Sequence, residues 1–181
     1  MIPTNKFLKL TGILLLLGGV VLASGCGQVA SEKALEDGAV LEKNGKLAAA
    51  MAEYNRAAEL SPDNTNAYYY RAMLYQKQGN LDAALADYNK IIELKPDYSD
   101  PYYGRGTIYD SKGQRDKAIA EYTKALENNV NNTLAYFKRA KAYEAKGEYR
   151  KALEDAQKAK VLGAAVKDDF LRQLEAGAAG R

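Results

Sequence analysis

Residues 67–94 read AYYYRAMLYQKQGNLDAALADYNKIIEL, two amphipathic stretches on either side of one glycine. Each stretch repeats small and large residues at the spacing of one helix face: Tyr68, Ala72 and Tyr75 in the first, and Ala84, Tyr88 and Ile91 in the second. Gly79 lies between them, where a residue that adopts positive φ at low cost can end a helix. The stretch predicts a helix, a tight turn and a second helix.

The same pattern returns every 34 residues along most of the chain. Matching residues form four rows: Gly45, Gly79, Gly113 and Gly147; Ala50, Ala84, Ala118 and Ala152; Tyr54, Tyr88 and Tyr122; and Pro62 and Pro96. A fixed period of this length indicates a stacked array of one two-helix unit. We place the units at residues 31–64, 65–98, 99–132 and 133–166.

These residues resemble the tetratricopeptide repeat (TPR), whose signature of aromatic, glycine, alanine and proline positions runs on this period. The third unit shows the signature well, with Tyr102, Gly106, Tyr109, Ala118 and Tyr122. The chain departs from it where tyrosine replaces the usual tryptophan and where Val130 replaces the proline. The resemblance implies an all-α fold, a right-handed TPR solenoid of four helix-turn-helix repeats.

The residues after the fourth unit predict one more helix. Val166, Phe170 and Leu174 are four residues apart and form one apolar stripe. We expect residues 167–176 to be a capping helix that covers the exposed face of the last repeat. Residues 177–181 are expected to be a frayed tail.

The N-terminus has the pattern of a secretory signal. Lys6 and Lys9 precede the apolar run TGILLLLGGVVLAS, residues 11–24, which is short for a membrane-spanning helix. The chain's one cysteine, Cys26, follows directly in LASGCG. Here the sequence resembles the lipobox of bacterial lipoproteins, which implies cleavage after residue 25 and lipid attachment to Cys26. The alternative is a free cysteine beside an ordinary signal or an uncleaved anchor.

On this interpretation residues 1–25 are a lipoprotein signal peptide and residues 26–30 a lipid-anchored tether. Gly27 after the cysteine resembles an outer-membrane address, so in a cell with two membranes the protein would face the periplasm. Removal of residues 1–25 takes away two lysines and leaves 24 basic and 23 acidic residues. This near-neutral balance gives no electrostatic case for nucleic acid as a partner.

The first helix of each repeat carries two aromatic rows. Tyr68, Tyr102 and Tyr136 are predicted to be core between the paired helices. The neighbouring face lines the concave groove in TPR arrays, so the resemblance predicts a groove that binds a partner protein or peptide. Its predicted residues are Tyr69, Met73, Gln76, Tyr103, Thr107, Asp110, Phe137, Lys141 and Glu144. Packing between units is the alternative for its aromatics, and Tyr70 has no role that the repeat explains.

A charged row accompanies the aromatic ones. Arg71, Arg105 and Arg139 are 34 residues apart, and an acidic row runs along the second helices: Glu53, Asp87, Glu121 and Asp155. Antiparallel pairing brings the arginine of a unit level with its acidic residue, so we predict a ladder of ion pairs beside the core. Anion binding by the arginines is the less favoured alternative.

Enzyme chemistry finds little support. The chain has no histidine, and no glycine-rich phosphate loop opens a helix. We therefore expect no enzymatic activity, no metal and no cofactor.

The resemblance implies a membrane-anchored interaction scaffold of the bacterial cell envelope. Relatives of this design assist assembly of secretins, pili or outer-membrane machinery, or bring peptidoglycan-processing enzymes together, and the residues do not choose among these tasks. The competing hypothesis is a self-associating structural lipoprotein, such as a homodimer. A third interpretation drops the lipid and leaves a soluble periplasmic or anchored adaptor.

Overall fold

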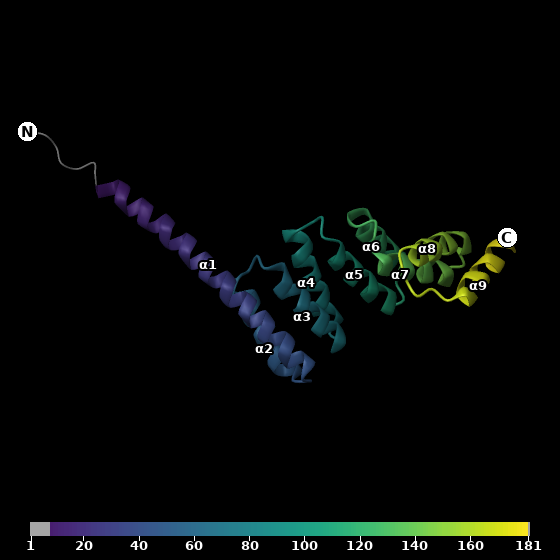
Figure 1. The fold of residues 1–181 in the computed structure, drawn as a ribbon, viewed down its shortest axis with the longest axis horizontal. Helices are drawn as coiled ribbons and strands as arrows, with labels where there is room; N and C mark the ends of the chain where they lie inside the picture. The colour runs from purple at the N-terminus through teal and green to yellow at the C-terminus, as the bar shows by residue number, and fades with distance from the viewer. Residues whose placement is uncertain (1–7, 181) are drawn as a thin grey trace, which may run out of the picture. The chain divides into compact units, whose positions relative to one another are not determined.

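The computed structural model describes residues 8–180, and the side chains of residues 26–180. These residues form nine α-helices and no strand, which confirms the all-α prediction. The helices are α1 (Leu8–Lys43), α2 (Leu47–Leu60), α3 (Thr65–Lys77), α4 (Leu81–Leu94), α5 (Ser99–Ser111), α6 (Arg115–Asn128), α7 (Thr133–Ala145), α8 (Tyr149–Val161) and α9 (Asp168–Ala179) (Figure 1). The chain divides into two compact units, residues 1–71 (unit 1) and residues 72–181 (unit 2).

Glycine ends the first helix of each repeat as predicted. Gly45, Gly79, Gly113 and Gly147 have φ between 70° and 78°. The residue after each glycine donates its backbone N–H to the carbonyl five residues earlier, as Asn80 does to Tyr75 at 2.9 Å. This is the hydrogen bond of a Schellman motif, and it satisfies a carbonyl that the helix end would leave unpaired.

Unit 1 is built on the pair α1 and α2. Tyr54 of α2 is 1% exposed and packs against Gly38 of α1, where an added Cβ would lie 2.5 Å from the ring. Buried Ser31 donates a hydrogen bond to the carbonyl of Ala57 at 2.8 Å. The N-terminal part of α1 extends beyond its pairing with α2 (Figure 1).

The structure changes the expectation for residues 26–30. They were predicted to be a short tether, yet they are helical residues of α1. The reason is local packing: Gly27 lies so close to the end of α2 that a Cβ there would be 2.8 Å from the Leu60 carbonyl oxygen. Residues 1–25, the predicted signal peptide, lie outside the part of the chain whose side chains are described.

Unit 2 stacks helix pairs around small residues. Tyr88 and Tyr122 of the second helices are at most 2% exposed, and Ala84 and Ile91 are fully buried, as the second-helix stripe predicts. Tyr88 packs against Gly104 of the next repeat, where an added Cβ would lie 2.4 Å from the ring. Without a side chain at this position, α5 can lie directly against the tyrosine ring.

The first-helix row of tyrosines is not core. Tyr68, Tyr102 and Tyr136 are half-buried, and the fully buried tyrosines are instead Tyr54, Tyr88 and Tyr122. The hydroxyls of Tyr68 and Tyr102 donate to the carbonyls of Pro62 and Pro96, at 3.0 and 2.9 Å. This row therefore lies at the edge of the core, where each ring can be buried while its hydroxyl bonds to a turn.

The last helix, α9, packs on the fourth repeat. Leu174 is fully buried in a cluster with Ala156 and Val166, and Phe170 and Leu171 pack against the same cluster. The helix ends at Ala179, three residues beyond the predicted end of the cap. Gly177 accounts for the extension, because its backbone lies directly on the Tyr149 ring.

Within residues 26–180, whose side chains the structure describes, no helix is both long enough and apolar enough to cross a bilayer.

The close approach at Gly104 generates a stability prediction. Gly104→Ala places a methyl group against the Tyr88 ring, and the resulting overpacking should lower the free energy of unfolding by about 1–3 kcal/mol despite the better helix propensity of alanine. Chemical denaturation followed by circular dichroism measures the change. Gly180→Ala is the control, since the nearest atom there is 3.6 Å away. Equal stability of the Gly104→Ala variant and the wild type would contradict the packing argument.

Candidate functional site

The predicted groove face is partly assembled in unit 2 by the last turn of α3 and by α5. Gln76 links the two helices: its Oε1 accepts a hydrogen bond from Tyr88 at 2.5 Å, and its Nε2 donates to Thr107 at 3.1 Å. Thr107 in turn donates to the carbonyl of Gly104 at 2.7 Å. These bonds connect the second and third repeats at this surface.

Two larger side chains accompany this hydrogen-bonded row. Met73 is 48% exposed, and its polarizable thioether suits an adaptable apolar contact. Tyr103 is half-buried, and its ring lies 5.9 Å from the buried ring of Tyr122. Burial raises the pKa of the Tyr103 phenol, so its hydroxyl remains a neutral hydrogen-bond donor. The surface therefore offers an apolar contact and a flat aromatic contact.

The hydroxyl of Tyr122 is buried and has no hydrogen-bond partner, the one such side-chain group among the described residues. In the two preceding repeats the equivalent hydroxyl has a partner twelve residues earlier. Tyr54 donates to Glu42 at 3.1 Å, and Tyr88 donates to Gln76. The third repeat has Asp110 at that position, one methylene shorter. Burial, followed by the negative charge of Asp110, raises the pKa of the Tyr122 phenol.

Helix α9 engages the groove residues of the fourth repeat. The ring of Phe137 contacts Phe170 of α9 edge to face, with 6.1 Å between the centroids. Lys141 Nζ lies 4.6 Å from the centroid of the Phe170 ring, and Glu144 accepts a hydrogen bond from Gln173 of α9 at 2.8 Å. These three predicted groove residues therefore contact α9. The other predicted residues of unit 2 lie on α3 and α5, whereas α9 packs mainly on α8: they are Met73, Gln76, Tyr103, Thr107 and Asp110.

Tyr69 and Tyr70 belong to unit 1 and meet each other there. Their rings pack edge to face at 6.0 Å, and Tyr70 stacks on Tyr54 with the centroids 5.8 Å apart. Tyr70, which the repeat pattern did not explain, thus covers the buried tyrosine of the preceding repeat. Its equivalent Gly104 lies against Tyr88 in the same way. The glycine at this position was the signal that sequence reasoning missed.

The ion-pair ladder is confirmed in unit 2. Arg105 makes a bidentate pair with Glu121 at 2.6–3.0 Å, and Arg139 makes one with Asp155 at 2.7 and 2.8 Å. Burial disfavours the charged form of Arg139, but the hydrogen bonds to Asp155 and the negative charge of Asp155 act together against it, and the pKa of the guanidinium is raised.

Each arginine also reaches back to the preceding repeat, which was not predicted. Arg105 Nη1 donates to Asn89 at 2.7 Å, and Arg139 Nη1 donates to Thr123 at 2.9 Å. In unit 1, Arg71 donates to Asn55 at 3.0 Å. All three acceptors lie sixteen residues before their arginine, so the polar row Asn55, Asn89 and Thr123 was visible in the 34-residue period.

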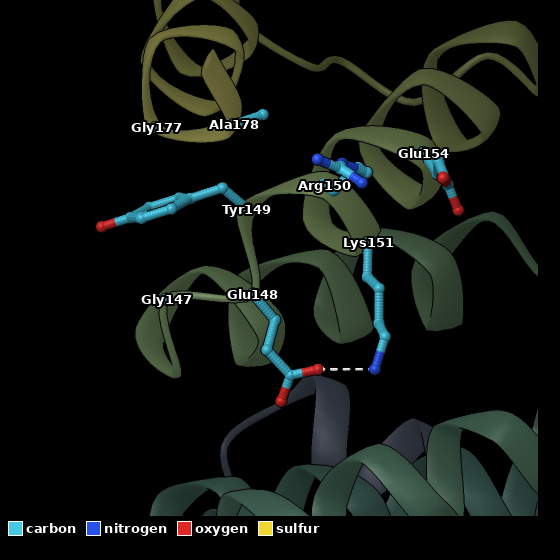
Figure 2. A pocket seen from close by; sticks show the side chains of 8 residues that line it. All are labelled: Gly147, Glu148, Tyr149, Arg150, Lys151, Glu154, Gly177 and Ala178. Carbon is cyan, nitrogen blue, oxygen red and sulfur yellow. Dashed lines mark hydrogen bonds and ion pairs between the residues drawn. The ribbon is translucent and has the colours of Figure 1, made fainter. Parts of the chain in front are cut away.

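One pocket of unit 2 is lined by none of the predicted groove residues. Figure 2 shows this cavity of about 530 Å³ between the start of α8 and the end of α9, lined by Gly147, Glu148, Tyr149, Arg150, Lys151, Glu154, Gly177 and Ala178. A second pocket of about 430 Å³ lies at the equivalent place one repeat earlier, around Gly113 and Lys146. The recurrence in two repeats indicates a notch that helix stacking leaves at these two turns.

The chemistry of the larger pocket is that of a solvated surface. Glu148 pairs with Lys151 at 2.7 Å, as the dashed line in Figure 2 shows, and with Lys146 at 2.8 Å. Hydrogen bonds from Lys146 and Lys151 lower the pKa of the Glu148 carboxyl to about 2. Among the described residues no three acidic or cysteine side chains gather in a way that could hold a metal ion.

Family models identify the repeats. The model "Tetratricopeptide repeat" matches residues 65–98, and the model "TPR repeat" matches residues 38–79 and 106–147. Together they span more than half of the chain. The chain belongs to the tetratricopeptide repeat proteins.

Solved structures share this fold. A crystal structure of MamA is 20% identical, with a TM-score of 0.72 over 83% of both chains. YrrB, described as a TPR protein with an unusual peptide-binding site, is 22% identical, with a TM-score of 0.66 over 82% of this chain and 77% of its own. The first TPR of Spaghetti (RPAP3), bound to an HSP90 peptide, is 24% identical, with a TM-score of 0.62 over 65% of this chain and 94% of its own. No curated protein matches the sequence significantly.

The unpaired Tyr122 hydroxyl predicts that lengthening the side chain at position 110 by one methylene stabilises the protein. Asp110→Glu should bring a carboxylate within reach of Tyr122, as Glu42 is of Tyr54, and raise the free energy of unfolding by about 1 kcal/mol. Thermal and chemical denaturation measure the gain. The reciprocal variant Glu42→Asp should lower stability by a similar amount. If Asp110→Glu leaves stability unchanged or lowers it, chain length at position 110 does not explain the missing bond.

Proposed function

We propose that this protein is a lipid-anchored interaction scaffold of the bacterial cell envelope that binds an extended segment of a partner protein. The observation that carries the proposal is the surface of Met73, Gln76, Tyr103, Thr107 and Asp110, which stays clear of α9 in an all-α repeat fold. We name these five residues the open groove surface. Concave faces of stacked repeats commonly bind extended ligands.

The chemistry of the open groove surface suits a peptide with mixed side chains. Met73 gives an adaptable apolar contact, and Tyr103 gives a flat aromatic contact that loses little conformational entropy. Asp110 adds a carboxylate that favours a basic or amide group on the ligand. YrrB and the RPAP3 repeat support this assignment, since the first is described as having an unusual peptide-binding site and the second is bound to an HSP90 peptide.

The position of Cys26 supports the anchor. Cys26 is exposed on α1, directly after the apolar run of residues 11–24. A thioether-linked diacylglycerol there would hold the repeats at a membrane, because two acyl chains bury enough methylenes for stable attachment. The identity of the partner protein will show which envelope assembly the scaffold serves.

Self-association is a second candidate function that one observation favours. Three large apolar side chains of unit 2 are strongly exposed: Val130 (63%), Leu134 (59%) and Val161 (80%). Thr133 Oγ1 donates to the carbonyl of Leu162 at 3.4 Å, so the chain around Leu134 lies beside the chain around Val161. A homodimer that buries these residues would leave the open groove surface available.

Site-specific photo-crosslinking tests the groove. A photoreactive phenylalanine analogue at Tyr103 should crosslink one envelope protein in intact cells, while the same analogue at exposed Lys124 of α6 should not. Met73→Glu in the Tyr103 background should reduce the crosslink, because it puts a charge into the apolar contact.

Mass spectrometry of the crosslinked band separates the candidates. A different protein attached at position 103 supports the scaffold, whereas attachment of a second copy of this chain supports self-association. Equal crosslinking from positions 103 and 124 would overturn the groove assignment.

Cys26→Ser tests the anchor. Without the thiol no thioether can form, so the variant should fail to incorporate labelled palmitate and should keep residues 1–25. Metabolic labelling and the mass of the purified chain report both changes. Labelling of the Cys26→Ser variant at the wild-type level would exclude Cys26 as the attachment site.

A further inference from the structure

Helix α1 carries an uncharged, partly exposed stretch at residues 26–31 that the proposed groove does not use. Cys26 and Val29 are exposed on α1, and Val29 is 68% exposed. At 100° per residue they lie within about 60° of each other around the helix. Residues 26–31, CGQVAS, contain no charge, and the first charged residues are Glu32 and Lys33.

The end of α2 joins this surface within unit 1. Leu60, the last residue of α2, is 37% exposed, and its carbonyl oxygen would lie 2.8 Å from a Cβ at Gly27. Cys26, Val29 and Leu60 therefore lie at the same end of the α1–α2 pair. We name these three residues the anchor-end patch.

Residues 26–31 do not behave as a linker between anchor and body. They continue α1 without a break, Gly27 lies against the end of α2, and Ser31 is tied to Ala57. A lipid on Cys26 would thus be attached to a helix that is already packed, so that the anchor and unit 1 move as one body.

We infer that the anchor-end patch is a membrane-docking surface that rests on the phospholipid interface beside the acyl chains. This inference rests on the lipid attachment proposed above. The uncharged turns from Cys26 to Glu32 span about 9 Å along the helix axis, similar to the depth of about 5–10 Å to which interfacial helices bury their apolar face.

Charged groups around the patch limit the depth of docking. Lys33 is paired with Asp37 at 2.6 Å further along the exposed face of α1. Asp63 follows α2, and a hydrogen bond from Ser61 lowers the pKa of its carboxyl, so it stays ionised. These groups belong at the level of the headgroups, which leaves Val29 and Leu60 at the boundary with the acyl chains.

Two exposed valines of α1 provide a probe position and a matched control position for an introduced tryptophan. It contains no tryptophan, so a single introduced tryptophan reports one position. Val29 and Val40 are both exposed valines of α1, at 68% and 59%, and lie within about 20° of one another around the helix. They are about 16 Å apart along the axis, so Val40 shares the face but not the anchor end.

The experiment places Val29→Trp and Val40→Trp, each in the full chain produced in a lipidating bacterium, into phosphatidylethanolamine–phosphatidylglycerol vesicles with and without brominated acyl chains. In vesicles with brominated lipid, the tryptophan emission of Val29→Trp should be quenched, while that of Val40→Trp stays unquenched. In vesicles without bromine, the emission of Val29→Trp should shift to shorter wavelength. Circular dichroism shows that both variants keep the wild-type helix content.

Three outcomes decide the matter. Quenching at position 29 alone supports the docking surface. Equal quenching of both variants, or quenching of neither, overturns it. Mass spectrometry of the same samples shows whether Cys26 carries the lipid. An unmodified Cys26 would refute the proposed anchor, while the quenching comparison would still decide the docking surface.

Discussion

The repeat depends on one packing constraint, a buried second-helix tyrosine pressed against positions that have almost no side chain. Tyr54 meets Gly38 of its own repeat, and Tyr122 meets Gly106 of its own repeat. Each ring fills the space between two helices, and at Gly38 and Gly106 the missing Cβ leaves room for the ring. These rings are the largest fully buried side chains of an alanine-rich core, so they help to set the helix spacing together with the glycines.

The arginine ladder holds successive repeats in register around those rings. All three guanidinium nitrogens of Arg105 are used: Nε and Nη2 bond to Glu121, and Nη1 bonds to Asn89 of the preceding repeat. The guanidinium also lies 5.5 Å from the centroid of the Tyr102 ring. An anion would have to displace these partners, so the ladder is structural. Its partly buried charges are tolerable because each one is paired.

Much of the fold could be predicted from the sequence, because a 34-residue period carries helix, turn and core together. Gly79 and Tyr88 each follow from local rules of φ and helix spacing. The assignment of adjacent tyrosines to faces was harder. Tyr68 was placed in the core, but the fully buried position is the adjacent Ala67, one residue away around the helix. The period also could not show that α9 would contact Phe137, because that contact depends on how a helix outside the repeat packs.

The informative positions are those where one repeat departs from its neighbours while the scaffold stays the same. Position 104 lacks the ring that Tyr70 provides one repeat earlier, and Asp110 is one methylene shorter than Glu42. The preceding repeats form the same kind of helix pair with longer residues at these positions, Tyr70 and Glu42. Positions 104 and 110 both lie in α5, the helix that also carries Tyr103 and Thr107. A repeat that only had to stack would gain stability from the larger residue at position 110. Asp110, the shorter residue, leaves the buried Tyr122 hydroxyl unpaired beside the open groove surface. A lower stability at this place is compatible with a binding function, because binding sites often reduce the stability of a fold.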